Sequence, residues 1–342
     1  DALRFTFAAL ASTGRDINFD LGRIEGYRNF CNKLWNAARY VLLNTEGKDC
    51  GQHSDYVQLS AADRWIISLL QQTEEEVTRG IEGYRFDLAA QAIYTFVWDE
   101  YCDWYLELSK PVLTSPDSTD AALRGTRRTL VRVMETVLRL IHPIAPYISE
   151  EIWQRMAPLA GIDAGTIMHQ PYPVAAADSV DQEAISEINW VKNFIIGVRK
   201  IRSGMNIDPR KPLPVLLQNG SKEDKSRLEN NLHYIVSVGR IETATWLQDC
   251  DAAPQASTAL VDEMKILIPL AGLIDKDAEM ARLTKEIERK NGELQRCEGK
   301  LSNAGFVDKA PAAVVQKEQE KATELRSAIN SLQEQQHKIQ SL

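Results

Sequence analysis

The chain has few cysteines, and no two of them lie close together. The five are widely separated along the sequence: Cys31, Cys50, Cys102, Cys250 and Cys297. An odd number without a C-x-x-C pair fits poorly with a disulfide framework or a zinc site, so we expect reduced thiols and no metal. No apolar run approaches the roughly 20 residues that span a bilayer, and no basic-then-apolar leader opens the chain. We therefore expect a cytoplasmic protein without membrane contact.

Positive charge is also in short supply. The 342 residues include 40 Lys and Arg but 48 Asp and Glu, which gives a formal net charge of −8 and a pI near 5.4. Such a chain does not bind nucleic acid through its bulk charge, so we expect no DNA binding, and local basic patches must supply any contact with RNA. The composition otherwise allows an ordinary globular core, and the length predicts two or three domains.

One stretch has no acidic residue at all. Between Gly26 and Thr45 there is no Asp or Glu. Wound as a helix at about 100° per residue, this stretch collects apolar residues on one side and polar residues with one tryptophan on the other. The apolar side consists of Phe30, Leu34, Ala37, Ala38 and Val41, and the polar side of Arg28, Asn32, Trp35, Asn36 and Arg39.

The polar side of this helix allows two interpretations. A basic, amide-rich helix face with a large aromatic suits an anionic partner that carries bases. The alternative is that Arg28 and Arg39 pair with carboxylates on neighbouring helices while the asparagines make local caps. Residue chemistry alone favours this second, structural interpretation.

The apolar spacing is helical almost throughout residues 23 to 153. Gly, Pro and Asp/Ser breakers divide this region into predicted helices at 23–44, 61–82, 84–109, 119–141 and 146–157. Five helices joined by short breakers predict an antiparallel bundle.

Within the bundle, three features invite a functional interpretation. The carboxylates of Asp99, Glu100, Asp103 and Glu107 alternate with aromatics as in a sugar cleft, but the aromatics have the spacing of a buried stripe, which favours a structural role. Arg124, Arg128, Arg132 and Arg139 share a face with Glu135, which favours ion pairing inside the bundle. His142 has no nucleophile or metal partner nearby and is interpreted as a helix-end residue. We predict no catalytic residue.

A smaller α+β unit is expected after a linker at 174–181. Its predicted helices are 183–203 and 222–238, and its predicted strands are 213–218, 241–247, 259–261 and 264–269, which suggests a small mixed sheet. The loop at the end of the first helix is the most basic patch, with Arg199, Lys200 and Arg202. RNA contact and stabilisation of the helix C-terminus by positive charge are equally compatible with it.

The tail from Asp275 has heptad spacing. One apolar row runs from Met280 to Leu301 and a second from Val315 to Ile339, so two helices joined by a Gly305/Pro311 turn make an antiparallel coiled-coil hairpin about 40 Å long. In this register the acids turn toward the seam, whereas a basic row lies outside: Arg282, Lys285, Arg289 and Arg296. Charged outer positions also occur for solubility alone.

Several segments together resemble one protein family. R-N-F-C-N-K-L-W-N-A-A-R at 28–39, A-D-R-W-I at 62–66, C-D-W-Y-L-E at 102–107 and L-I-H-P-I-A-P-Y-I-S-E-E-I-W at 140–153 resemble the anticodon-binding domain of the class I tRNA synthetases for branched aliphatic amino acids. The hairpin, with K-L-S-N at 300–303 and G-F-V at 305–307, resembles the C-terminal arm of the valyl-tRNA synthetases.

The resemblance implies a mainly α protein built of four parts. These are a connector from a catalytic domain (1–22), a helical-bundle anticodon-binding domain (23–170), a small α+β domain (171–274) and a coiled-coil arm (275–342). The H-I-G-H and K-M-S-K-S motifs of the family's catalytic domain do not occur. We therefore expect no cofactor in this chain, with ATP and Mg²⁺ acting elsewhere in the parent enzyme.

The partner implied by the resemblance is tRNA(Val), bound by a monomer. The bundle would use Arg28, Asn32, Lys33, Trp35, Asn36 and Arg39, the basic loop Arg199, Lys200 and Arg202, and the arm its outer basic row. Two alternatives stay open, namely the corresponding region of an isoleucyl- or leucyl-tRNA synthetase and a non-enzymatic coiled-coil scaffold.

Overall fold

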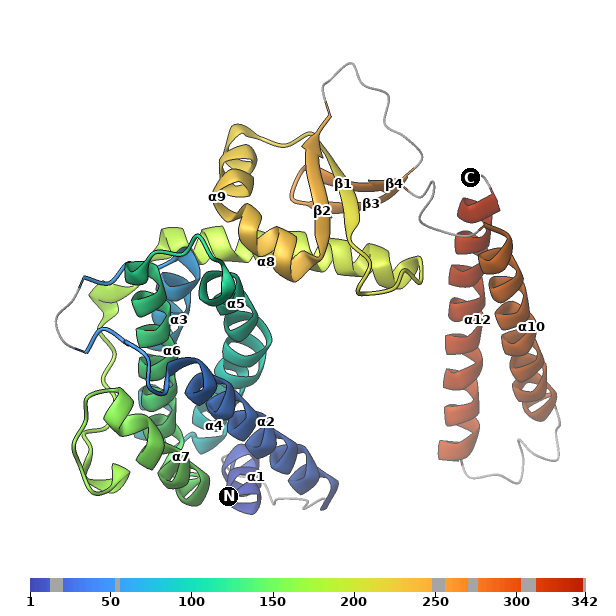
Figure 1. Ribbon diagram of the computed structural model, residues 1–342. Coiled ribbons are helices and arrows are strands. Elements are labelled where there is room, and N and C mark those ends of the chain that lie inside the picture. The colour runs from blue at the N-terminus through green and yellow to red at the C-terminus, as the bar shows by residue number, and fades with distance from the viewer. Residues whose placement is uncertain (13–20, 53–55, 248–255, 270–275, 303–311, 341–342) are drawn as a thin grey trace. The chain divides into compact units, whose positions relative to one another are not determined.

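A computed structural model describes residues 1–12, 21–52, 56–247, 256–269, 276–302 and 312–340 (Figure 1). The chain is mainly helical with a small four-stranded sheet, which confirms the predicted fold class. Contacts divide it into two compact units, residues 1–193 with 227–238, and residues 194–226 with 239–342. This division differs from the predicted boundary between 170 and 171.

The first unit is a bundle whose helices follow the predicted apolar spacing. Its principal helices are α1 (Ala2–Leu10), α2 (Leu21–Thr45), α3 (Ala61–Glu82), α4 (Phe86–Thr95), α5 (Leu106–Thr114), α6 (Asp120–Ile141) and α7 (Pro146–Leu159), and η2 (Ile167–His169) and η3 (Ala177–Ser179) are short 3₁₀ turns. The bounds of α2, α3, α6 and α7 lie within two residues of the predicted ones.

The predicted helix at 84–109 is longer than expected. A π-helical segment, η1 (Phe96–Tyr105), joins α4 to α5 without a break, and α5 runs on to Thr114 with Pro111 inside it. The prediction ended the helix before this proline. One proline removes a single backbone donor, whereas the buried side chains of Leu108 and Ser109 hold this turn against the bundle.

The predicted connector at 1–22 contains a helix that belongs to the bundle. Phe5 of α1 is fully buried and lies 5.0 Å from the ring of Phe30. The carboxylate of Asp1 accepts hydrogen bonds from the backbone N–H groups of Tyr147 and Ile148, in the first turn of α7. Helix α1 therefore packs on this unit and contributes Phe5 and Thr6 to its core, while 13–20 lie outside the described residues.

The second unit contains the mixed sheet that the sequence predicts. Its strands β1 (Leu213–Gln218), β2 (Ile241–Trp246), β3 (Ala256–Val261) and β4 (Met264–Pro269) are arranged in the order β2-β1-β4-β3. β1 and β2 are parallel and are joined through α9 (Lys222–Gly239), whereas the other two pairings are antiparallel. The C-terminal part of α8 (Gln182–Gly204) packs on this sheet so closely that a Cβ at Gly197 would lie 3.3 Å from Ala259 and from Ile266.

The coiled-coil hairpin is formed by α10 (Lys276–Leu301) and α12 (Ala312–Gln340), which lie side by side in Figure 1. Several of the predicted seam residues are buried between them: Leu283, Cys297, Ala322, Leu325 and Ile329. Two ion pairs cross between the helices, Lys300 with Glu318 at 2.9 Å and Arg326 with Glu298 at 2.6 Å. The predicted Gly305/Pro311 turn lies outside the described residues.

Candidate nucleic-acid interface

The orientation of helix α2 is fixed by its buried side. Phe30, Leu34, Ala37, Ala38 and Val41 are all buried, as the sequence predicts. The ring of Phe30 lies within about 5 Å of two other rings, with 5.0 Å to Phe5 and 5.1 Å to Tyr94. Because this cluster determines which side of α2 faces the core, the opposite side faces solvent.

The solvent-facing side carries the residues expected there. We call Arg28, Asn32, Trp35, Asn36 and Arg39 the polar face of α2, and all five side chains are exposed. Trp35 is 48% exposed, which leaves much of its indole plane open for stacking. Leu43, 69% exposed, extends this surface by about one helical turn beyond Arg39. Sequence reasoning missed Leu43, although its helical position relative to Arg39 and Asn36 was readable.

Electrostatic partners do not block the polar face. Arg28 pairs with Glu25 of its own helix at 3.0 Å, and both side chains are exposed, so the pair is weak and easily exchanged. Within the described parts of the chain, Arg39, Asn32 and Asn36 have no side-chain hydrogen bond or ion pair. The alternative interpretation, pairing with carboxylates on neighbouring helices, is thus not what the structure has.

Lys33 is placed differently from the rest of the predicted set. Its ammonium group lies 2.6 Å from a carboxylate oxygen of Asp103 and 3.8 Å from the centre of the Trp98 ring. Trp98 in turn stacks on Tyr94 at 5.5 Å. The prediction that Lys33 belongs with the RNA-facing residues needs correction, because these contacts hold it against η1 and leave its side chain only 22% exposed.

The basic segment at the end of α8 needs correction at one residue. Arg199, Lys200 and Arg202 all lie within the helix, as the predicted helix at 183–203 has them, and not in a loop after it. Arg199 and Lys200 are exposed, whereas Arg202 is 6% exposed. Its guanidinium donates to four backbone carbonyls, those of Asp208, Lys211, Gly239 and Arg240.

Arg202 therefore ties together the turn after α8 and the start of β2. Burial lowers the pKa of its guanidinium below the ordinary value, which agrees with a structural position. No sequence signal reveals this, because two of the four carbonyls, those of Gly239 and Arg240, come from a distant segment of the chain.

The basic row of the arm is on the outside but is not free of acids. Arg282 pairs with Glu286 at 2.8 Å, and Arg289 pairs with Glu293 at 2.9 Å. The prediction that the acids turn to the seam while the bases turn outward is therefore wrong in part, since each arginine reaches across one helical turn to a glutamate. Lys285 and Arg296 are exposed, and Arg296 donates to the backbone carbonyl of Gly292 at 3.2 Å.

Three of the four carboxylates that alternate with the aromatics of η1 and the start of α5 are engaged in ion pairs. Glu100 contacts Lys192 at 2.5 Å, Asp103 contacts Lys33, and Glu107 contacts Lys110. The aromatic side chains Tyr101, Trp104 and Tyr105 are buried. This arrangement confirms the structural interpretation of the stripe and leaves no pair of opposed carboxylates for sugar chemistry among these residues.

The polar residues of α6 and the turn after it have mixed roles. Arg139 makes a bidentate pair with Glu135 at 2.8 and 2.9 Å, as expected. Nδ1 of His142 lies 2.7 Å from the hydroxyl of Ser149, and burial lowers the pKa of His142, which confirms a helix-end role. The expected ion pairing does not extend to all arginines of α6, because Arg128 and Arg132 have no such partner among the described residues.

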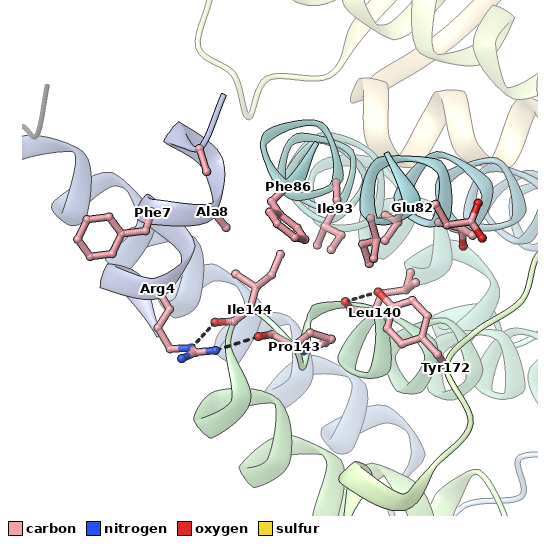
Figure 2. Close-up of a pocket in the computed structure, with 15 residues that line it drawn as sticks. Arg4, Phe7, Ala8, Glu82, Phe86, Ile93, Leu140, Pro143, Ile144 and Tyr172 are labelled. Atoms are coloured by element: carbon pink, nitrogen blue, oxygen red, sulfur yellow. Dashed lines mark hydrogen bonds between the residues drawn. The ribbon is translucent and has the colours of Figure 1, made fainter. Parts of the chain in front are cut away.

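A large cavity of about 740 Å³ lies elsewhere in the bundle, between α1, the end of α3, α4 and the turn before α7. Figure 2 shows Phe86, Ile93 and Ile144 facing it, with Arg4 at its rim. The guanidinium of Arg4 donates to the carbonyls of Ile144 and Pro143, and Tyr172 donates to that of Leu140. The lining is mostly apolar, and the polar side chains of Arg4 and Tyr172 are hydrogen-bonded to backbone carbonyls. The lining residues therefore present no arrangement of side chains suited to catalysis.

Neither a membrane span nor a metal cluster occurs in the part of the chain that the structure describes. None of the described helices is long and apolar enough to cross a membrane. In the same residues, no three His, Cys, Asp or Glu side chains gather in a way that could hold a metal ion.

Comparison with known proteins adds two family matches. The family model described as the anticodon-binding domain of tRNA ligase matches residues 63–217, and the model described as the valyl tRNA synthetase tRNA binding arm matches residues 275–340. Together the two ranges cover more than half of the chain. Helix α2 precedes the first matched range, so its assignment rests on its own geometry.

The solved structures similar to this chain include the agnB2 LeuRS of Agrobacterium radiobacter K84, crystallised as the ternary complex LeuRS-tRNA-LeuAMS. The similarity covers 77% of this chain and 27% of that chain, at 17% sequence identity and a TM-score of 0.36. The chain thus spans about a quarter of the length of that protein.

Proposed function

Because this chain belongs to the class I aminoacyl-tRNA synthetases and carries a tRNA-binding arm of the valyl type, we propose that it recognises tRNA(Val). In this proposal the polar face of α2 reads the anticodon loop. The arm contacts the backbone at the outer corner of the same tRNA. The protein acts as a monomer in the cytoplasm.

The observation that carries the proposal is the combination of exposed groups on α2. An indole and a guanidinium, at Trp35 and Arg39, stand within about 40° of each other around the helix axis. Unpaired loop bases are recognised by stacking and by hydrogen bonds to their edges, and the amides of Asn32 and Asn36 supply both donors and acceptors. The only acidic residue of α2 is Glu25, whose carboxylate is paired with Arg28, and none follows it in the helix.

The arm supports the proposal in a different way. Arg289 and Arg296 are exposed, and the glutamate that pairs with Arg289 lies on the same helix. Exposed intrahelical pairs of this kind contribute only about 0.3–0.5 kcal/mol, so a phosphate can displace the glutamate at small cost. Such contacts position the RNA without reading its sequence.

The chemical step belongs to the rest of the parent protein in this proposal. ATP-dependent activation of valine and its transfer to tRNA need ATP and Mg²⁺, and neither H-I-G-H nor K-M-S-K-S occurs in this sequence. We expect the isolated chain to show no valine-dependent ATP–pyrophosphate exchange. Exchange above that of a heat-killed sample would contradict this assignment.

Selection from a mixed tRNA pool tests the proposal as a whole. The chain is incubated with unfractionated tRNA, the complex is isolated on a native gel, and the retained RNA is sequenced. The proposal predicts enrichment of valine acceptors. Enrichment of isoleucine or leucine acceptors would assign the chain to a sister enzyme, and no retention would support a coiled-coil scaffold.

A further inference from the structure

Helix α6 carries four arginines between positions 124 and 132, and the structure divides them into two pairs. Arg124 donates two hydrogen bonds, of 3.1 and 3.0 Å, to the carbonyl of Tyr56, and it also contacts the carboxylate of Asp49 at 3.4 Å. Arg127 donates to the backbone carbonyl of Asp49 at 3.4 Å. These two arginines tie down the segment that follows α2.

The other two arginines, Arg128 and Arg132, do not hold this segment. In the described part of the chain, neither guanidinium has a hydrogen-bond or ion-pair partner. Arg132 is exposed and Arg128 is half-buried. Their i, i+4 spacing places them on one face of α6 with Cβ atoms about 5–6 Å apart, so both guanidinium groups can meet one ligand.

A small surface depression lies beside this arginine pair. A depression of about 10 Å³ lies between α6, the segment after α2 and the end of α7, and its lining includes Cys50, Gly51, Gln52, Arg128, Arg132 and Leu159. A volume of this size holds one water molecule or one oxygen atom of a larger ligand. The side chain of Arg128 packs beside Gly51, where a Cβ would lie 3.8 Å from its Cδ.

Among the described residues, the two carboxylates of the preceding segment are already engaged. The carboxylate of Asp49 contacts Arg124 at 3.4 Å, and that of Glu46 pairs with Arg155 at 2.8 Å. The carbonyls of Pro158 and Leu159, at the end of α7, accept hydrogen bonds from the amide of Gln52. The arginine pair thus presents the N–H donors and the positive charge of two guanidinium groups in a chain whose net charge is −8.

We propose that Arg128 and Arg132 form a phosphate-binding site for the RNA backbone, built on α6 rather than on α2. The inference rests on the proposed tRNA binding and deepens it. A guanidinium group can bind two phosphate oxygens at once. The two guanidinium groups of Arg128 and Arg132 lie beside a depression that holds one oxygen atom, and this arrangement fits a backbone phosphate. The site positions the RNA and does not read its bases.

The test is a double substitution, Arg128→Gln with Arg132→Gln, in the whole chain. Affinity for a tRNA(Val) transcript is measured across about 50 to 200 mM KCl. The site predicts about tenfold weaker binding and a log–log salt slope that is smaller by about 0.7 to 0.9, because one phosphate is no longer neutralised and keeps its counterions. Discrimination between tRNA(Val) and a transcript with an altered anticodon stays as in the wild type.

A matched control separates this site from the general effect of charge. Arg132→Glu and Arg79→Glu change the net charge equally, and Arg79 is an exposed arginine on α3 paired only distantly, at 4.0 Å, with Glu75. The site predicts a clearly larger loss of affinity for Arg132→Glu. Should the double variant lose helicity by circular dichroism, Arg132→Gln alone gives the same test with a smaller change in slope.

Three results would overturn the inference. The first is an unchanged affinity and salt slope in the double variant while Arg39→Ala still weakens binding, which leaves the proposed function intact. The second is a loss of anticodon discrimination in the double variant, because the pair would then act in base reading. The third is an absence of tRNA binding by the wild-type chain, which removes the proposed function together with this site.

Discussion

The phenolic hydroxyl of Tyr105 donates a hydrogen bond of 2.6 Å to Oδ1 of Asp63, whose side chain is completely buried. The second carboxylate oxygen accepts from the hydroxyl of Thr126 at 2.9 Å and from the backbone N–H and hydroxyl of Ser60. Asp63 therefore caps the start of α3 and links it to η1 and α6. This buried carboxylate thus joins three helical elements of the bundle.

Tyr105→Phe tests the importance of this link for stability. Removing the hydroxyl deprives a buried carboxylate of a donor, so we expect the free energy of unfolding to fall by about 1–3 kcal/mol. Urea denaturation followed by circular dichroism measures the change. Tyr147→Phe is the matched control, because Tyr147 is 76% exposed. Equal stability of the two variants would contradict the assignment.

The raised pKa of the buried Glu74 side chain predicts that the stability of the protein depends on pH. Burial raises its pKa from 4.5 to about 7, and the positive charge of Arg139 partly opposes the shift. Since the folded state holds the proton more tightly than the unfolded one, the stabilising contribution of this group is complete below pH 4.5 and is lost as the pH rises through about 7.

Glu74→Gln removes this titration. We expect the variant to match the wild type near pH 4.5 and to gain about 1–3 kcal/mol relative to it at pH 8. Glu75→Gln, at the exposed neighbouring position, serves as the control and gains nothing of this kind. Parallel stability curves for wild type and Glu74→Gln across this range would rule out the raised pKa.

Arg39→Ala tests the polar face of α2. The exposed guanidinium has no partner among the described residues, so its loss leaves thermal stability nearly unchanged. Affinity for tRNA(Val), measured by fluorescence anisotropy, decreases by about 1–3 kcal/mol, the usual scale for hydrogen bonds to charged groups. A variant that melts early but binds normally when folded would place Arg39 in the core instead.

Replacing Arg282, Arg289 and Arg296 together by Gln tests the arm. Binding of tRNA weakens and its salt dependence flattens, by about 0.7–0.9 in log–log slope for each phosphate that an arginine no longer neutralises. The preference among anticodons stays the same, because interactions with the backbone carry no sequence information. An unchanged slope in a variant whose hairpin is still helical would leave this row without a role in RNA binding.

Much of the fold could be predicted because periodic burial leaves a local signature. The ends of α3 and β1 agree with the sequence prediction to the residue, and the buried side of α2 was correct in every member. The apolar seam of the hairpin was likewise readable from its heptads. In each case one element's own sequence contains the information.

Other features depend on groups that meet only after folding. Arg202 looked like part of an exposed basic loop, and its burial follows from carbonyls of the adjacent turn, at Lys211, and of a remote segment, at Arg240. Lys33 shares the acid-free stretch with Arg39, yet Asp103 and Trp98 on η1 capture its side chain. The glutamates of the arm lie near the seam by heptad position, but their long side chains reach outward to the arginines.

The central claim is that the polar face of α2 reads the anticodon of tRNA(Val). Its most direct test compares the affinity of the wild-type chain for two transcripts, tRNA(Val) and the same tRNA with a substituted anticodon, at one salt concentration. We expect the substituted transcript to bind at least about tenfold more weakly, a difference of about 1.4 kcal/mol. Equal affinities would contradict the claim, since binding would then depend on the backbone alone.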